Sequence, residues 1–359
     1  MSRHVRTQQI CTRLLRASST SPSSAALLVS GTYTSGSGSG QSTSHGAFQT
    51  RYYAAPRAKR VPRAPNAGPS TTTTYSLEDI PLQAFEGVVK AVRAHESTSD
   101  LFESMSPGQY YDVAQRFAEA IENGSSPYSV RLTGQNAFSA SALYDVGCLM
   151  RHIPEPRRAQ AFVVAMWASA SDMGYLPATV SLAREISMGG AWGSKPQLRK
   201  VEIRFKQLVS EGKDPNVLTV EGEQLYKLGK YDAAVRMLKQ ALLVGGDDFQ
   251  WEPNCRLYLG KAYLKIQKPV EAREAFESIT NLGYADGDGE LGQLLRASDL
   301  EKAEGHFYSA AINGQPDMFR HLSEIALENI ATATDAQAAK EQQLWAMEWA
   351  RLADSTEKS

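Results

Sequence analysis

The stretch from Val217 to Leu242, VLTVEGEQLYKLGKYDAAVRMLKQAL, decides the fold of this 359-residue chain. Its apolar residues recur at helical spacing on both sides of Gly229 and Lys230, where the pattern is interrupted. This arrangement predicts two amphipathic helices joined by a tight turn. Small residues would let the two helices approach each other closely, and larger ones such as Leu238 would fill the space between them.

The same order of residues returns in RLYLGKAYLKIQKPVEAREAFESI, which ends at Ile279. Gly260 follows Gly222 by 38 residues, which is longer than the roughly 34 residues of a common helical repeat. The extra length falls in Gly245-Gly246-Asp247-Asp248, a loop sequence. Pro269 stands at the turn and is expected to begin a helix, where its missing N–H is not needed. The two units together predict a tandem array of helix pairs.

These residues resemble tetratricopeptide repeats, while the flanking segments resemble the related Sel1-like repeats. The tetratricopeptide positions are Gly222, Leu225, Gly229, Tyr231, Ala234, Leu238 and Ala241, and then Leu259, Gly260, Tyr263, Ala272, Phe276 and Ile279. The Sel1-like positions are Asp299 to Ala303 with His306, Phe307, Ala310, Ala311, Gly314 and Pro316, echoed upstream by Trp167, Ala170, Gly174, Pro177 and Ala178. The resemblance implies an all-α fold, a right-handed α-α superhelix, and protein binding as its use.

Around this array, the sequence predicts five segments. Residues 1–53 are expected to be a mitochondrial transit peptide and 54–76 a disordered linker rich in Pro, Ala and Thr. Residues 77–138 should form N-terminal helices that cap the array, which itself occupies 139–354 and is followed by a tail, 355–359. A last helix containing Trp345 and Trp349 is expected to close the array. An alternating strand pattern is absent from the body of the chain.

The address is predicted from the charge and serine content of the N-terminal segment. Residues 1–77 hold eight Arg and one Lys but no acidic residue, and the first 53 include twelve Ser. This composition is typical of a mitochondrial presequence, and it lacks the compact apolar core of a secretory signal. Arg51-Tyr52-Tyr53-Ala54-Ala55 resembles a matrix-peptidase site, which would leave a mature chain starting near Ala54. A basic disordered tail that binds nucleic acid or anionic lipid is the alternative.

The rest of the chain is acidic, with 29 basic and 39 acidic residues and a net charge of −10 from residue 78 onward. A groove that binds RNA needs basic residues to neutralise phosphates, so nucleic acid is the disfavoured partner. Cysteine usage is sparse and unpatterned, with Cys11, Cys148 and Cys255 far apart. This fits a reducing compartment and favours the mitochondrial matrix over the intermembrane space. Peripheral attachment to the inner membrane stays open.

Three sequence patterns suggest chemistry but lack essential residues. Asp286 to Glu290 begins like a calcium loop, but Leu291 and Ala297 stand where an EF-hand needs Gly and Glu. Gly189 to Lys195 has the composition of a phosphate loop without the Walker spacing. Cys148 and His152 could share a helix face, yet a structural zinc site needs four ligands. We therefore expect no enzyme activity, no metal and no cofactor.

The family resemblance places a partner-binding groove on the first helix of each pair. By that resemblance its positions in this chain are Asn216, Thr219, Glu223, Tyr226, Lys227, Asn254, Leu257, Lys261, Leu264 and Lys265. Asn can hydrogen-bond a peptide backbone, and Lys suits carboxylates. The predicted function is a non-enzymatic scaffold or assembly factor in the matrix, for instance for cytochrome oxidase, that holds a peptide or helix. The alternative is a mitoribosome-associated or RNA-binding factor in mitochondrial gene expression.

Overall fold

A computed structural model describes residues 75–94, 102–132, 134, 137–153, 157–246 and 248–357. Within these ranges the chain forms fourteen α-helices and no β-strand. The helices are α2 (Leu82–Arg93), α3 (Pro107–Glu122), α4 (Ala140–Met150), α5 (Arg157–Asp172), α6 (Leu176–Met188), α7 (Arg199–Glu211), α8 (Pro215–Lys227), α9 (Tyr231–Gly245), α10 (Glu252–Lys265), α11 (Pro269–Asn281), α12 (Ala285–Leu295), α13 (Leu300–Ile312), α14 (Met318–Thr332) and α15 (Ala336–Glu357). The predicted transit peptide and its cleavage site lie outside the described residues.

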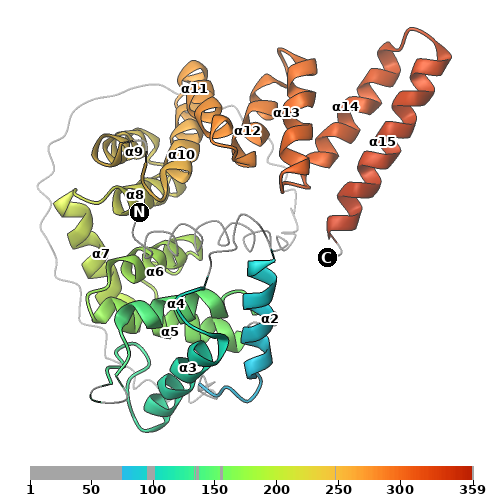
Figure 1. The fold of residues 1–359 in the computed structure, drawn as a ribbon. Coiled ribbons are helices and arrows are strands. Elements are labelled where there is room, and N and C mark those ends of the chain that lie inside the picture. Colours follow the sequence, from blue (N-terminus) through green and yellow to red (C-terminus); the bar gives the residue numbers. More distant parts are fainter. Residues whose placement is uncertain are drawn as a thin grey trace, which may run out of the picture.

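From α4 onward the helices pack as successive pairs, in which we call the first helix A and the second B. The pairs are α4/α5, α6/α7, α8/α9, α10/α11, α12/α13 and α14/α15. Each A helix also contacts the B helix of the preceding pair, as α10 contacts α9. The stack curves into an arc with α2 near one end and α15 at the other, and α6, α8 and α10 lie on its inner side (Figure 1). The predicted all-α superhelix of helix pairs is confirmed.

One packing motif recurs in four of the pairs. A β-carbon at Gly222 of α8 would come within 2.5 Å of Leu238 of α9, and one at Gly292 of α12 within 2.7 Å of Phe307 of α13. Gly260 meets Phe276 in the same way, and so does Gly147 with Trp167. In each pair a large B-helix side chain lies flat on a bare A-helix backbone, so only glycine fits. The glycines predicted to allow close helix approach, Gly222 and Gly260, do so.

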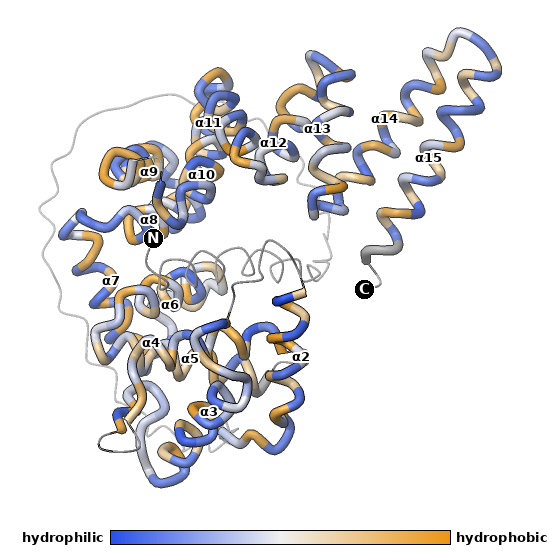
Figure 2. Tube along the Cα trace, viewed as in Figure 1, coloured by the Kyte–Doolittle hydropathy of each residue, from blue (hydrophilic) through white to orange (hydrophobic). Residues whose placement is uncertain are grey.

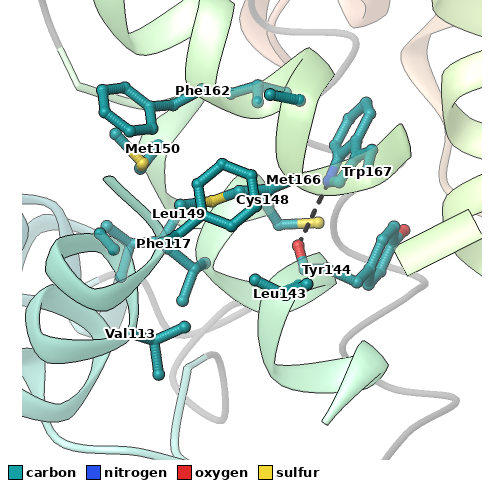
Figure 3. Close-up of a cluster of buried hydrophobic side chains, with 14 of the residues drawn as sticks. Val113, Phe117, Leu143, Tyr144, Cys148, Leu149, Met150, Phe162, Met166 and Trp167 are labelled. Atoms are coloured by element: carbon teal, nitrogen blue, oxygen red, sulfur yellow. Dashed lines mark hydrogen bonds between the residues drawn. The ribbon is translucent and has the colours of Figure 1, made fainter. Parts of the chain in front are cut away.

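The N-terminal part of the molecule contains a single continuous core. It is lined by α2 to α7, and its largest fully buried side chains include Trp167, Tyr110 and Tyr144. The Trp167 Nε1–H donates to the Tyr144 carbonyl at 3.3 Å, and the two rings stack with centroids 5.8 Å apart. Figure 3 shows Trp167 among Phe117, Phe162 and neighbouring apolar side chains. The helices α2 and α3, expected to cap the array, are therefore part of its thickest core.

Beyond α7 the core divides into smaller clusters, each shared by only a few neighbouring helices. One surrounds Leu238 between α8, α9 and α10, and another surrounds Phe307 between α12, α13 and α14. Hydrophobic and hydrophilic residues alternate along the helices in this part (Figure 2), as amphipathic segments require. None of these or the other described helices combines the length and apolar character needed to cross a bilayer.

Local sequence signals place several helix starts. The Ser106 hydroxyl and the Gln109 side chain form a reciprocal capping box at α3, and the Asp214 carboxylate accepts the Val217 N–H at 2.9 Å at α8. Pro269 begins α11, as predicted. At the C-terminal end, α15 continues to Glu357, three residues beyond the boundary expected for the repeat domain.

Candidate functional site

The inner side of the arc is organised by the residue that follows the small residue of each A helix. This position is Arg184 in α6, after Ala183, then Glu223 in α8 and Lys261 in α10. The Arg184 Nε donates to the Glu223 carboxylate at 2.7 Å, and the Asn254 amide of α10 donates to the same carboxylate at 3.3 Å. Three successive A helices are thus joined by one polar contact set.

This contact set is buried. The side chain of Glu223 is 2% exposed and that of Arg184 14%. The Arg184 guanidinium also lies 5.2 Å from the centroid of the Trp251 ring. Burial lowers the pKa of Arg184, but Glu223 outweighs it and holds that pKa above its usual value. Breaking such a pair leaves an uncompensated charge in the interior, so it acts as a clamp between repeats.

The structure corrects the predicted groove at four positions. Glu223 and Asn254 face each other inside the molecule, and Thr219 is fully buried with its hydroxyl donating to the Pro215 carbonyl at 2.8 Å. The Asn216 side-chain oxygen accepts the Trp251 N–H at 3.0 Å. The reason is that α6, α8 and α10 pack directly against one another, which closes the inner side of α8. These residues connect repeats and do not line an open groove.

A different part of the predicted set remains at the surface. We call Tyr226, Lys227, Tyr258, Lys261 and Lys265 the lysine–tyrosine rim. The rings of Tyr226 and Tyr258 meet with centroids 5.5 Å apart, which brings the C-terminal halves of α8 and α10 together. Lys261 pairs with Glu290 of α12 at 2.8 Å, while Lys227 and Lys265 are exposed. Leu257 is buried and Leu264 is half-buried.

Lys227 and Lys265 occupy equivalent places, each five residues after the close-packed glycine of its helix. The Lys227 Nζ lies 3.5 Å from the Met188 carbonyl of α6. Burial lowers the pKa of Lys227, while Glu223 raises it and Arg184 lowers it further, so its pKa lies below the usual range. The amine is therefore partly stripped of water at the surface, which favours capture of an anionic group.

The other polar features are structural or too small for a substrate. A pocket of about 60 Å³ is far below the several hundred Å³ that a drug-sized ligand occupies. It is lined by Tyr144, Leu176, Pro177, Val180, Ser181, Asp214, Asn216, Gln250 and Trp251. No group of three or more His, Cys, Asp or Glu in the described ranges could hold a metal ion.

The motifs examined for chemistry are also parts of helices. Asp288, from the calcium-like stretch, lies in α12 and accepts hydrogen bonds from the Ser309 hydroxyl and the His306 ring, both at 2.8 Å. Because Ser309 bonds to the carboxylate and not to the imidazole, this is no nucleophile arrangement. Cys148 is buried, and burial followed by the nearby Arg151 lowers the pKa of His152 to about 4. The arrangement thus offers surfaces for binding.

Comparisons with known proteins bear on the fold. No protein-family model matches the sequence, and no curated protein matches it either. Among solved structures, the chain is similar to the crystal structure of a Sel1 repeat protein from Oxalobacter formigenes, with 18% sequence identity and a TM-score of 0.42. The match covers 67% of this chain and 97% of that one. The chain is a helical repeat protein, the fold implied by the resemblance to tetratricopeptide and Sel1-like repeats.

Proposed function

We propose that this protein is a non-enzymatic scaffold that captures an acidic segment of a partner protein on the lysine–tyrosine rim. The observation that carries the proposal is the placement of Lys227 and Lys265 at equivalent positions of two adjoining A helices, on either side of the Tyr226–Tyr258 contact. Repeating one positive group at the repeat period gives a row that an extended chain can follow.

The geometry limits what the partner presents. Packed helices lie about 8–10 Å apart, and an extended chain advances about 3.3 Å per residue. Two carboxylates about three residues apart could therefore reach Lys227 and Lys265 together. The tyrosine rings between them offer apolar faces and hydroxyl groups for the residues in between.

For the cellular role, we propose action in the mitochondrial matrix, in the assembly of a respiratory complex such as cytochrome oxidase. The acid-free, Arg- and Ser-rich composition of residues 1–53 supports the address. N-terminal sequencing of the protein recovered from mitochondria should give a first residue near Ala54. An intact Met1 on the mitochondrial protein would contradict the processing, and its absence from mitochondria would contradict the address.

The binding site is tested by charge reversal. We expect Lys227→Glu/Lys265→Glu to remove partner proteins that co-purify with the wild-type chain from mitochondria, quantified by mass spectrometry. The matched control is Arg236→Glu/Lys239→Glu, which reverses two exposed charges on α9 away from the rim. Equal recovery with both variants would contradict the rim assignment. Salt-sensitive recovery of RNA in place of protein would favour the alternative role in gene expression.

A further inference from the structure

A second surface lies on the outer side of the last helix. Every B helix before α15 is covered by the A helix of the next pair. The Cys255 thiol of α10 contacts the Leu238 carbonyl of α9 at 3.3 Å, and the His321 ring of α14 stacks on Phe307 of α13 with centroids 4.7 Å apart. The helix α15 forms the edge of the molecule in Figure 1, and no described helix follows it.

The orientation of α15 identifies which of its residues face outward. Ala346 and Ala353 are buried against α14, and the Ala346 carbonyl accepts the Ser323 hydroxyl at 2.9 Å. The Trp349 ring turns back toward the array and meets Tyr308 of α13 at a centroid distance of 6.0 Å. With 3.6 residues per turn, the side turned away from both contacts carries Lys340, Leu344, Met347 and Arg351. We call these four residues the outer stripe.

The outer stripe differs from the polar end that closes a repeat array. Terminal repeats keep such proteins soluble by presenting a polar outer face. Here Leu344 is 59% exposed and Met347 64% exposed at the centre of the face. Their spacing within Lys340, Leu344, Met347 and Arg351, four, three and four residues, is the spacing by which one helix packs along another. The stripe is thus shaped to receive a helix.

The charges at its ends select the kind of helix. Lys340 and Arg351 bracket the apolar centre, and two hydrogen bonds of 2.6 and 2.9 Å to Glu348 orient the Arg351 guanidinium. A second copy paired antiparallel about Leu344 and Met347 would set Lys340 against the Arg351 of its neighbour, a like-charge contact. An amphipathic helix with an apolar centre and acidic residues toward its ends meets both bases instead.

We propose that α15 docks an amphipathic, acid-flanked helix of another protein, which continues the array as the next A helix would. This surface is separate from the lysine–tyrosine rim, and the two sites make independent predictions. Docking here would let the scaffold hold two segments of a complex at once.

The probe is a pair of fluorescein-labelled helical peptides of about five turns, identical along an apolar stripe and carrying either Glu or Lys at its two ends. Fluorescence anisotropy with the full chain should show the Glu peptide binding at least about tenfold more tightly than the Lys peptide. Leu344→Glu/Met347→Glu should weaken binding of the Glu peptide by about tenfold or more, and Lys340→Glu/Arg351→Glu should reverse the preference. No saturable binding of the Glu peptide would overturn the proposal.

The matched control is Leu243→Glu/Val244→Glu, two exposed apolar residues on α9 that should leave peptide affinity unchanged. Because Leu344 and Met347 are exposed, both double variants should keep the wild-type circular dichroism spectrum and melting temperature. The rim variant Lys227→Glu/Lys265→Glu should also bind the Glu peptide normally, which separates the two proposals. A dimer in sedimentation that Leu344→Glu/Met347→Glu abolishes would assign the face to a second copy and overturn the proposed partner.

Discussion

The two ends of this molecule bury their apolar residues in different ways. From α2 to α7, one core extends through several helices, so a side chain such as Trp167 is enclosed completely. From α12 to α15, each helix packs only on its neighbours, and Trp345 on α15 is 52% exposed. A thick core fixes the position of its residues, whereas a single layer of helix pairs leaves both of its sides available to partners. The difference teaches where stability and where binding should reside.

The largest expected effect is at the centre of the thick core. Trp167→Ala should lower the free energy of unfolding by about 4–5 kcal/mol, because it removes a fully buried ring that packs on Gly147 and Tyr144. Urea denaturation followed by circular dichroism measures the change. A loss below about 1 kcal/mol would mean that the core repacks, and the contrast between the two regions would fail.

The clamp between the regions should come next. Glu223→Ala should lower the free energy of unfolding by about 3–4 kcal/mol, because it leaves the Arg184 guanidinium buried without its carboxylate. The matched double variant Arg184→Met/Glu223→Leu removes both charges and should recover most of this loss. If the double variant is as unstable as the single one, packing and not charge holds the repeats together here.

A pH-dependent term belongs to the thick core alone. Burial raises the pKa of Asp145 from 3.8 to about 7, so between these values the folded chain binds a proton that the unfolded chain has released. Stability should therefore be greatest below about pH 4 with respect to this group and fall as the pH rises to about 7. Asp145→Asn should remove this slope and stabilise the protein at pH 8 by on the order of 3 kcal/mol.

Urea titrations of wild type and Asp145→Asn at pH 5 and pH 8 test this directly. The difference between the two proteins should grow toward pH 8. A constant difference would show that Asp145 is ionised in the folded state across the range.

The smallest effect is expected on the thin end. Trp345→Ala should change the free energy of unfolding by less than about 1 kcal/mol, because the ring is half exposed and packs on one face of Trp349 with centroids 5.2 Å apart. The same denaturation assay compares it with Trp167→Ala. An equal loss in the two tryptophan variants would show that the array unfolds from its C-terminal end.

Several structural features could be predicted because they depend on residues close together in sequence. Gly222 and Leu238, or Gly260 and Phe276, meet across one short turn, and their spacing reports the contact. Pro269 marks its helix start by its own chemistry. The Gly147–Trp167 pair follows the same rule, but twenty residues separate them, and this longer connection hid the shared register.

The candidate site was harder to predict, because it depends on contacts between repeats. Arg184 and Glu223 are 39 residues apart, and only the stacking of α6 on α8 makes them neighbours. Opposite charges at the same register of consecutive repeats were a signal that could have revealed this pair. Lys227 and Lys265 were predicted as part of the site and remain at the surface, and their role in binding stays a prediction.

The sequence by itself determined that the chain folds into paired helices with glycine contacts within each pair, because amphipathic period and close packing across a turn are local properties. Only the tertiary structure decided how the pairs stack. Stacking buried Glu223 and Asn254, left the lysine–tyrosine rim open and exposed the outer side of α15. The physical reason is that burial of a surface residue in a repeat array depends on the neighbouring repeat, whose distance and tilt are set by side chains far away in the chain.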